Sequence, residues 1–439
     1  MGSSAVRAAV VDTSGRLLGR SRRAHRIALP APGRAEYDPR AWLAGALTTG
    51  GEAVAEAAGV DVVAVAIGAL GPSPLLVDDR LEPLTPSLPY VLDLRAEEQR
   101  SRLGVSVDHA LPKLLWWKEN EPERYRRGAW ALDATGYLVA ALTGEPTMDA
   151  ITRAAYEHAA VEADIALPAP LDPLAYAGRL RADPAQALGL RAGTPVAAGT
   201  FDTYVDIAGA DVGPGGGCLV LGSTLAVYAV VTEAEPAAGL ELTPYPGEGL
   251  LLGGTTAAAG SVLRWLSNVL RSDGADLAAE AAGLEPGSGG LVALPYLAGE
   301  RVPFSDARAR GALVGLTLAT GAAEAYRAFV DALALSAADI ANRLPRAGTW
   351  RACGGGCQDP AWLGATSDAL GVPVEVVAHA GEAVGPAVLA LRSAGFDPPV
   401  ELTVRVEPDP ERTTLYRMLS GRYRGLYERL RPLVQELPR

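Results

Sequence analysis

The sequence is poor in lysine, cysteine and histidine, and each shortage excludes a kind of site. Its two lysines, Lys113 and Lys118, do not follow a glycine-rich loop, so a P-loop that holds phosphates with a lysine is excluded. Three cysteines are an odd set that cannot pair completely, and the sequence carries no sign of secretion that would favour disulfides. The four histidines form no i, i+4 pair, so the helical H-E-x-x-H metal motif is absent.

Charge and hydropathy also limit the partners of this chain. A net charge of −12 at pH 7 opposes binding to a nucleic-acid backbone, which needs clustered cations. No apolar run approaches the roughly 20 residues needed to cross a bilayer. The N-terminus also lacks the basic and then apolar pattern of a signal peptide. We therefore expect a cytoplasmic protein that binds neither nucleic acid nor membrane and takes a small molecule as its partner.

The pattern of strands and helices predicts an α/β protein of two domains. At 439 residues the chain can bury two cores, and we place the domains at residues 1–210 and 211–439. Strands and helices alternate along it, which is typical of α/β folds. The expected strands are 5–11, 61–70, 194–199, two within 217–231, and 349–353. The expected helices are 39–58, 112–143, 262–270, 360–370 and 411–437, with a connecting region at 158–192.

Two glycine–hydroxyl turns are candidate phosphate sites. Gly222-Ser223-Thr224 joins two strands, and Gly2-Ser3-Ser4 has the form of the second half of a D-x-G-[ST]-[ST] turn. In such turns backbone N–H groups can point at phosphate oxygens, because glycine permits close approach. The repeat suggests two related halves that face one nucleotide, and we expect a strand and a carboxylate upstream of Met1. The alternative for either turn is an ordinary hairpin.

Two further stretches of small residues precede expected helices. One runs from Gly253 to Gly260 and leads into the helix at 262–270, whose N-terminus could favour an anion. The other, Gly354-Gly355-Gly356, lies between a strand and a helix, where its amides could approach a base or a phosphate. Close packing of the helix is the alternative explanation for the first stretch.

Asp202 is the candidate catalytic carboxylate. It lies in Gly199-Thr200-Phe201-Asp202-Thr203, after an expected strand and at the start of an expected helix. An Asp at this position often caps the helix, which is worth about 1 kcal/mol. The alternative is a carboxylate that accepts a proton from a substrate hydroxyl.

A series of motifs, in order along nearly the whole chain, resembles the FGGY family of carbohydrate kinases. The early G-x-x-E-x-D-P-x-x-W pattern is matched from Gly33 to Trp42, and a D-x-R pattern follows at Asp93 to Arg95. Further matches are Leu142-Thr143-Gly144-Glu145 with Asp149, Leu294-Pro295-Tyr296-Leu297-Ala298-Gly299-Glu300-Arg301-Val302-Pro303, Asp306, Ala309-Arg310-Gly311, Gly354-Gly355-Gly356, and Glu382-Ala383-Val384-Gly385-Pro386-Ala387.

This resemblance implies two ribonuclease H-like domains of the actin-like ATPase type, with a cleft between them that closes over ATP. It implies transfer of phosphate from ATP, with Mg²⁺, to a sugar or polyol. By position, Asp202 is the general base, and Asp93, Arg95 and Thr203 lie near the sugar. The matched nucleotide-binding positions are Gly2, Ser3, Ser4, Gly222, Ser223, Thr224, Gly260, Arg264, Gly355 and Gly356. The Asp that the family uses around magnesium would precede Met1, so the metal ligands are left unassigned.

The substrate that this resemblance implies is a ketopentose such as xylulose, or a related polyol. The chain departs from the xylulose kinase pattern at Gly71-Pro72-Ser73-Pro74, where those enzymes commonly show G-Q-M-H-G. One alternative is therefore a catalytically impaired relative that binds sugar or nucleotide in a regulatory role. Another is a heat-shock or actin-like ATPase, which would share the fold but lack the G-E-R-x-P segment. The number of subunits stays open, with a homodimer as one candidate assembly.

Overall fold

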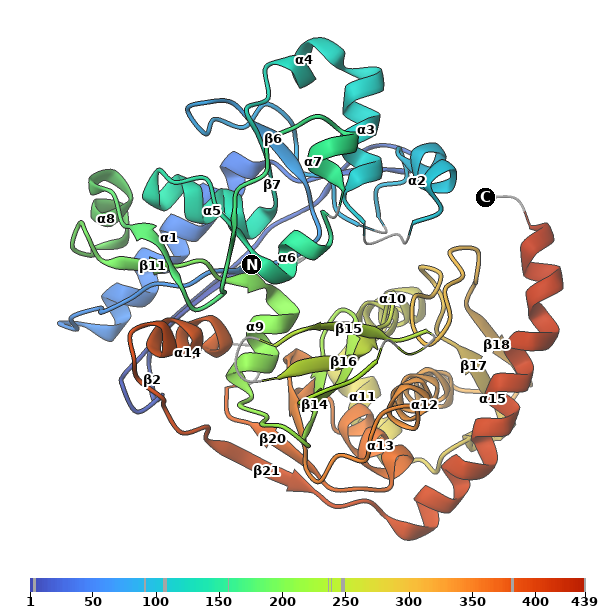
Figure 1. Ribbon diagram of the computed structural model, residues 1–439. Coiled ribbons are helices and arrows are strands. Elements are labelled where there is room, and N and C mark those ends of the chain that lie inside the picture. Colours follow the sequence, from blue (N-terminus) through green and yellow to red (C-terminus); the bar gives the residue numbers. More distant parts are fainter. Residues whose placement is uncertain are drawn as a thin grey trace. The chain divides into compact units, whose positions relative to one another are not determined.

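The chain folds into two compact units (Figure 1). The computed structural model describes residues 1–2, 5–90, 92–105, 109–156, 158–235, 237, 239–245, 249–379 and 383–437. The first unit holds Met1–Gly209 and Glu382–Val400, and the second holds Ala210–Gly381 and Glu401–Arg439. The segment Glu382–Val400 thus folds with the N-terminal residues. The single boundary expected after residue 210 would place this segment in the second domain.

The second unit is built on a seven-stranded sheet of order β15-β16-β14-β13-β19-β20-β21. Its strands are β13 Gly217–Leu221, β14 Leu225–Val231, β15 Glu241–Pro244, β16 Leu250–Thr255, β19 Trp350–Cys353, β20 Val374–Val377 and β21 Leu402–Val406. At its centre β13 runs antiparallel to β14 and parallel to β19. All five residues of β13 are buried, as expected for a strand that is covered on both faces.

Helices and a small two-stranded sheet complete the second unit. They are α10 Gly260–Leu270, α11 Gly274–Ala282, α12 Ala322–Ala341, α13 Pro360–Leu370, α15 Pro410–Glu436, β17 Val292–Leu294, β18 Ala312–Val314 and the 3₁₀ turns Ser288–Gly290 and Gly355–Gln358. Most of α12 is buried, which places it at the centre of the hydrophobic core. None of the described helices combines the length and the apolar character that a membrane span requires.

The first unit pairs its strands two by two. The pairs are β1 Ala5–Val11 with β2 Leu17–Ala24, β3 Ala28–Ala31 with β4 Arg34–Glu36, β5 Gly68–Ala69 with β12 Thr200–Phe201, β6 Leu75–Val77 with β7 Trp130–Leu132, β8 Met148–Asp149 with β9 Pro170–Leu171, and β10 Tyr176–Arg179 with β11 Pro195–Ala197. Its helices are α1 Pro39–Ala57, α2 Glu97–Leu103, α3 Leu111–Asn120, α4 Pro122–Arg126, α5 Ala134–Thr143, α6 Ala150–Ala154, α7 Ala159–Glu162, α8 Ala182–Leu188, α9 Asp202–Gly209 and α14 Val384–Ser393.

Three helices begin at an Asp-Pro pair. Asp38, Asp359 and Asp409 are the N-caps of α1, α13 and α15, and each side chain accepts a backbone N–H from the first turn. The following proline has no N–H to leave unpaired, and its fixed φ suits the first helical position. The predicted starts of α1 and α13 are therefore confirmed, and α15 begins one residue before its predicted start.

Three expected elements differ from the structure. Of the strand expected at 61–70, only Gly68–Ala69 forms strand pairs, and Val65 adds one isolated bridge to Val196. The helix expected at 112–143 is broken into α3, α4 and α5 by Pro122 and by β7. The region read as a connection at 158–192 contains α7, α8 and the short strands β9 and β10. Elements of two to seven residues are too short to show a sustained period.

A buried ion pair joins α12 to its neighbours in the second unit. Arg327 Nε donates to Asp331 Oδ1 over 2.7 Å, and the Arg327 Nη2 donates to the Tyr416 hydroxyl over 2.9 Å. The Tyr416 hydroxyl donates to Asp331 Oδ1 over 2.6 Å. The Leu284 carbonyl accepts from Arg327 Nη1 over 2.7 Å, so the guanidinium also holds the segment that follows α11. Each charge is thus paired where water is excluded.

We expect Arg327→Met to lower the free energy of unfolding by roughly 3–5 kcal/mol, because it leaves the Asp331 carboxylate buried without its cation. Urea unfolding measures the loss. The matched control is the double variant Arg327→Met/Asp331→Leu, which removes both charges and should lose less than Arg327→Met alone. A double variant that is less stable than the single one would contradict this account.

Candidate active site

Asp202 stands where a parallel strand ends and a helix begins. It is the first residue of α9, directly after β12, and β12 runs parallel to β5. In α/β proteins this end of a parallel strand is where ligands commonly bind. Asp202 Oδ1 accepts the backbone N–H of Thr203 over 2.8 Å, and the Thr203 hydroxyl lies 3.5 Å from the same oxygen. The backbone N–H of Thr203 therefore holds the half-buried carboxylate in place.

Asp206, one helical turn after Asp202, is a second carboxylate at this position. Desolvation, with the charge of Asp202 as a smaller cause, raises the pKa of Asp206 to about 7. Desolvation also raises the pKa of Asp202, against the opposing effect of the Met1 amino group. Two interacting carboxylates with raised pKa values in one place are typical of functional sites.

The first residues of the chain lie beside these carboxylates. The Met1 amino group donates to the Gly68 carbonyl, and its charge acts on both Asp202 and Asp206. A methyl group on Gly2 would lie 3.7 Å from Asp202 Oδ2. The structure thus brings Gly2 and Asp202 together. Ser3 and Ser4, the other predicted residues of this turn, lie outside the described residues.

Asp93 and Arg95 form an ion-pair network with Glu36. Arg95 Nη2 lies 2.8 Å from Asp93 Oδ2 and 2.6 Å from Glu36 Oε1. Asp93 Oδ2 also accepts the backbone N–H of Ala35 over 2.8 Å. The guanidinium carbon of Arg95 lies 5.1 Å from the centroid of the Trp116 ring. The side chains of Asp93 and Arg95 are 0% and 4% exposed, so both are occupied in fixing the segment around Ala35.

In the second unit the Gly222-Ser223-Thr224 turn is fastened to the start of α10. The Gly222 carbonyl accepts the N–H of Gly260 over 3.0 Å, and a side chain on Gly260 would come within 2.5 Å of that oxygen. The Ser223 carbonyl accepts the Ser261 hydroxyl over 2.8 Å. Arg264, exposed on the same helix, reaches the Ser223 hydroxyl over 3.4 Å. The predicted residues Gly222, Ser223, Thr224, Gly260 and Arg264 therefore lie in one place.

The glycines at 354–356 follow β19, the neighbour of β13, and adjoin the same turn. Gly354 has a φ of +93°, and a side chain there would approach the Leu221 carbonyl to 2.6 Å. A Cβ on Gly356 would lie 2.4 Å from the Trp362 ring, which would also lie 3.5 Å from a Cβ on Gly260. A Cβ on Gly355 would meet nothing within 4 Å. The backbone at Gly355 is therefore open to a ligand.

Glu300, from the Gly299-Glu300-Arg301 segment, braces the loop before α10. Its Oε1 accepts the N–H groups of Ala257 and Arg301, each over 2.8 Å. The Arg301 guanidinium donates to the Thr256 carbonyl over 3.1 Å. Burial raises the pKa of Glu300 to about 7. The Gly299-Glu300-Arg301 segment thus supports the loop at Thr256 and Ala257, just before α10.

Sequence reasoning missed Asp206, the Met1 amino group and the bracing role of Glu300. Asp206 follows Asp202 at i, i+4, so its position on the same helix face could have been noticed. The Trp362 ring, against which Gly260 and Gly356 pack, carried no sequence signal, because a buried Trp has the same pattern in any core helix.

Comparisons with known proteins show which family this chain resembles. The models of the N- and C-terminal domains of the FGGY family of carbohydrate kinases match residues 1–209 and 217–394. A xylulose kinase of Staphylococcus epidermidis is 26% identical over 484 residues, which cover 100% of this chain and 97% of its own. The structure of a xylulose kinase from Rhodospirillum rubrum matches with a TM-score of 0.83 and 26% identity, covering 99% of this chain and 98% of its own.

A gluconate kinase structure from Lactobacillus acidophilus shares the fold with a TM-score of 0.84 and 20% identity, and covers 98% of this chain and 96% of its own. The predicted α/β fold class, two ribonuclease H-like units of the actin-like ATPase type, is confirmed by these matches. The chain therefore belongs to the FGGY family of carbohydrate kinases and is a sugar kinase.

Proposed function

We propose that this kinase transfers the γ-phosphoryl group of ATP to a hydroxyl of a ketopentose such as xylulose, or of a related polyol. The observation that carries the proposal is the Asp202 carboxylate, held by Thr203 at the end of β12 with its pKa raised by desolvation. A carboxylate whose pKa lies closer to neutral is a better acceptor for a hydroxyl proton. The names of the full-length relatives support the ketopentose.

In this proposal Asp202 takes the proton of the attacking hydroxyl, and Thr203 orients the carboxylate. We give Asp93 and Arg95 a positioning role for the sugar site, because their polar atoms already bind each other, Glu36 and Ala35. Ser73, in the Gly71-Pro72-Ser73-Pro74 segment, has its polar groups bound within the protein and therefore offers little to a sugar. Its N–H donates to Asp133 Oδ2 over 2.7 Å and its hydroxyl lies 2.7 Å from that of Ser87.

We propose that the second unit binds the nucleotide. The Gly222-Ser223-Thr224 turn presents N–H and hydroxyl groups to the phosphates, and Arg264 beside Ser223 adds a positive charge. The open backbone of Gly355 and the packed Gly356 and Gly260 would admit a flat adenosine group. Fixed dipoles of this kind stabilise transferring phosphate without having to reorient during the reaction.

Mg²⁺ is part of the proposal because FGGY kinases use ATP. The described residues contain no group of three or more His, Cys, Asp or Glu side chains that could hold a metal alone. One or two carboxylates together with substrate phosphates and water are the usual Mg²⁺ ligands. Asp202 and Asp206, adjacent on α9, fit that smaller role. When bound, the ion would neutralise negative charge on the phosphates.

A regulatory relative without catalysis is the second candidate, motivated by the altered Gly71–Pro74 segment. The two candidates separate in one assay, in which xylulose, ribulose, glycerol and gluconate are each tested for sugar-dependent release of ADP from Mg-ATP. Binding of a sugar without ADP release would favour the regulatory role. The homodimer stays a prediction that analytical ultracentrifugation tests.

We expect Asp202→Asn to lower kcat for sugar phosphorylation by roughly 10²–10⁴-fold, because the amide cannot accept the hydroxyl proton. ADP binding in the absence of Mg²⁺, measured by calorimetry, should stay unchanged, since the Gly222-Ser223-Thr224 turn, Arg264 and Gly355 lie in the second unit. Asp183→Asn, an exposed Asp on α8, is the matched control and should keep full activity. Unchanged turnover in Asp202→Asn would return this residue to a purely structural role.

Gly355→Leu should raise the Kd for ADP about tenfold, or by roughly 1.4 kcal/mol, because the new side chain would fill the space assigned to adenosine. The thermal unfolding temperature should not fall, since no protein atom lies within 4 Å of a Cβ at this position. Gly364→Leu on α13 meets the same open space and is the control. Equal ADP affinity in both variants would remove Gly355 from the nucleotide site.

Asp206→Asn should raise thermal stability at about pH 8 but not at about pH 4. The pKa of Asp206 is about 7 in the folded chain and lies above its unfolded value, so folding takes up a proton between these two pKa values. The contribution of Asp206 to stability is therefore present at low pH and is lost as the pH rises through 7. Scanning calorimetry across this range checks it, and parallel curves for the variant and the parent protein would contradict it.

A further inference from the structure

The first turn of α5 is bonded to the two strands that end beside Asp202. The Thr135 hydroxyl donates to the Thr200 carbonyl over 3.0 Å and accepts the N–H of Ala69 over 3.1 Å. Ala69 ends β5 and Thr200 begins β12, so this one side chain bonds a backbone group of each paired strand. Thr135 is buried, so water does not compete for these two hydrogen bonds.

Asp133 fixes the start of α5. Its side chain caps the helix by accepting the N–H of Ala134 through Oδ1, over 2.8 Å. Its Oδ2 accepts the Ser73 N–H over 2.7 Å and the Tyr156 hydroxyl over 2.9 Å. The bond to Ser73 ties the segment that follows β5 to the helical turn that carries Thr135. The position of Thr135 relative to β5 is therefore set by two neighbouring side chains.

One residue, Phe201, separates Thr200 from Asp202. A Cβ on Gly71 would lie 2.1 Å from the Phe201 ring, so the ring packs directly against the Gly71 backbone. The packed ring cannot shift to absorb a displacement, because protein interiors leave little free space. A displacement of the Thr200 carbonyl would therefore be passed on to Asp202.

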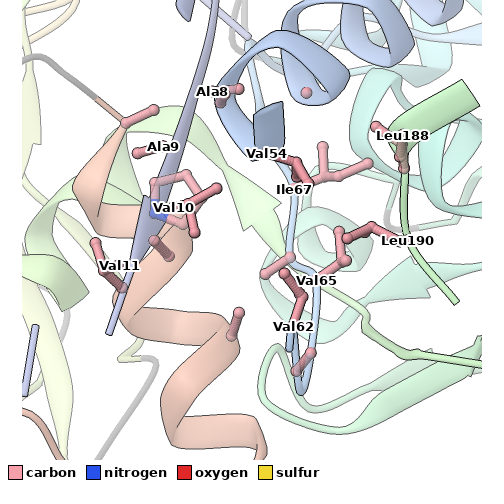
Figure 2. A pocket seen from close by; sticks show the side chains of 18 of the residues that line it. Ala8, Ala9, Val10, Val11, Val54, Val62, Val65, Ile67, Leu188 and Leu190 are labelled. Carbon is pink, nitrogen blue, oxygen red and sulfur yellow. The ribbon is translucent and has the colours of Figure 1, made fainter. Parts of the chain in front are cut away.

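Apolar packing between α5 and this strand edge is incomplete. An apolar cavity of about 430 Å³ lies in the first unit, and Leu138 and Leu142 of α5 line it together with Ile67 and Gly68. Figure 2 shows β1, with Val10, on one side of the cavity and the segment that carries Ile67 on the other. Atoms that face a void have no partner atoms on that side and lose dispersion contacts. The alignment of α5 with β5 therefore depends on the hydrogen bonds of its first turn.

We propose that Thr135 is a positioning residue for Asp202, whose two hydrogen bonds align the end of β12 so that the carboxylate meets the substrate hydroxyl. This inference rests on the proposed role of Asp202 as the general base. A base must lie within about 3 Å of the group whose proton it accepts. A misplacement of about 1 Å can lower the rate roughly 10²-fold. Thr135 acts on this distance through the backbone and not on the substrate.

The test compares Thr135→Val, which keeps the shape of the side chain and removes both hydrogen bonds, with Thr135→Ser, which keeps the hydroxyl. We expect Thr135→Val to lower kcat for sugar phosphorylation by about tenfold and to leave KM for sugar and ATP unchanged, because only Asp202 is displaced. Thr135→Ser should keep the parent kcat. The matched control is Thr143→Val at the other end of α5, where the hydroxyl likewise donates to a carbonyl, of Val139, and accepts an N–H, of Glu145.

A double-mutant cycle with Asp202→Asn separates positioning from a general loss of structure. In the Asp202→Asn background Thr135→Val should have no further effect on kcat, because no base remains to be misplaced. An equal loss of kcat in both backgrounds would overturn the proposal. So would the parent kcat in Thr135→Val, or the same loss in Thr143→Val.

The cycle also distinguishes this inference from the proposed function. Full turnover in Asp202→Asn would overturn the general-base role and the positioning role together, whereas slow turnover there with an equal Thr135→Val effect in both backgrounds would overturn the positioning role alone. Hydrogen exchange of the amides at 200–203 needs no substrate and should be faster in Thr135→Val than in Thr143→Val. Equal exchange in the two would contradict the alignment by Thr135. If Thr135→Val is not folded by circular dichroism, Thr135→Ala, which needs less space, takes its place.

Discussion

The structure depends on the pairing of a buried central strand on both of its edges. In the second unit β13 meets this requirement, and the turn that follows it can form only because Gly222, Gly260 and Gly354 let backbones approach each other closely. The hydrogen bonds from Gly260 and Ser261 to the Gly222 and Ser223 carbonyls close the turn. The phosphate site that we propose at this turn would therefore be a by-product of ending a doubly covered strand.

At the carboxylates of α9 the proposed function and the stability of the fold are in conflict. Desolvation raises the pKa values of Asp202 and Asp206, so keeping these carboxylates ionised in the folded chain costs free energy. Asp93 differs, because every oxygen it presents is matched by a donor from Arg95 or Ala35. Satisfied charges of this kind hold a site in place, whereas poorly compensated charges such as Asp202 are available for chemistry.

Elements with strong local signals could be predicted from the sequence. The start of α1, the paired strands around Gly222-Ser223-Thr224 and the helix at 360–370 are predicted, because turns and periodicity are local signals. The stretch 61–70 was expected to be a strand and mostly is not. Its β-branched residues have the propensity, but propensity does not supply a hydrogen-bond partner. The packing of Gly356 and Gly260 against Trp362 could not be predicted from the sequence either, since it depends on long-range contacts.

The two units differ in how their strands pair. Both contain a glycine–hydroxyl sequence before an apolar strand, which is β14 in the second unit and β1 in the first. In the second unit seven strands form one sheet, whereas the strands of the described part of the first unit form separate pairs. Local propensity does not account for this difference, because a segment becomes a regular strand only where a neighbouring segment supplies hydrogen bonds.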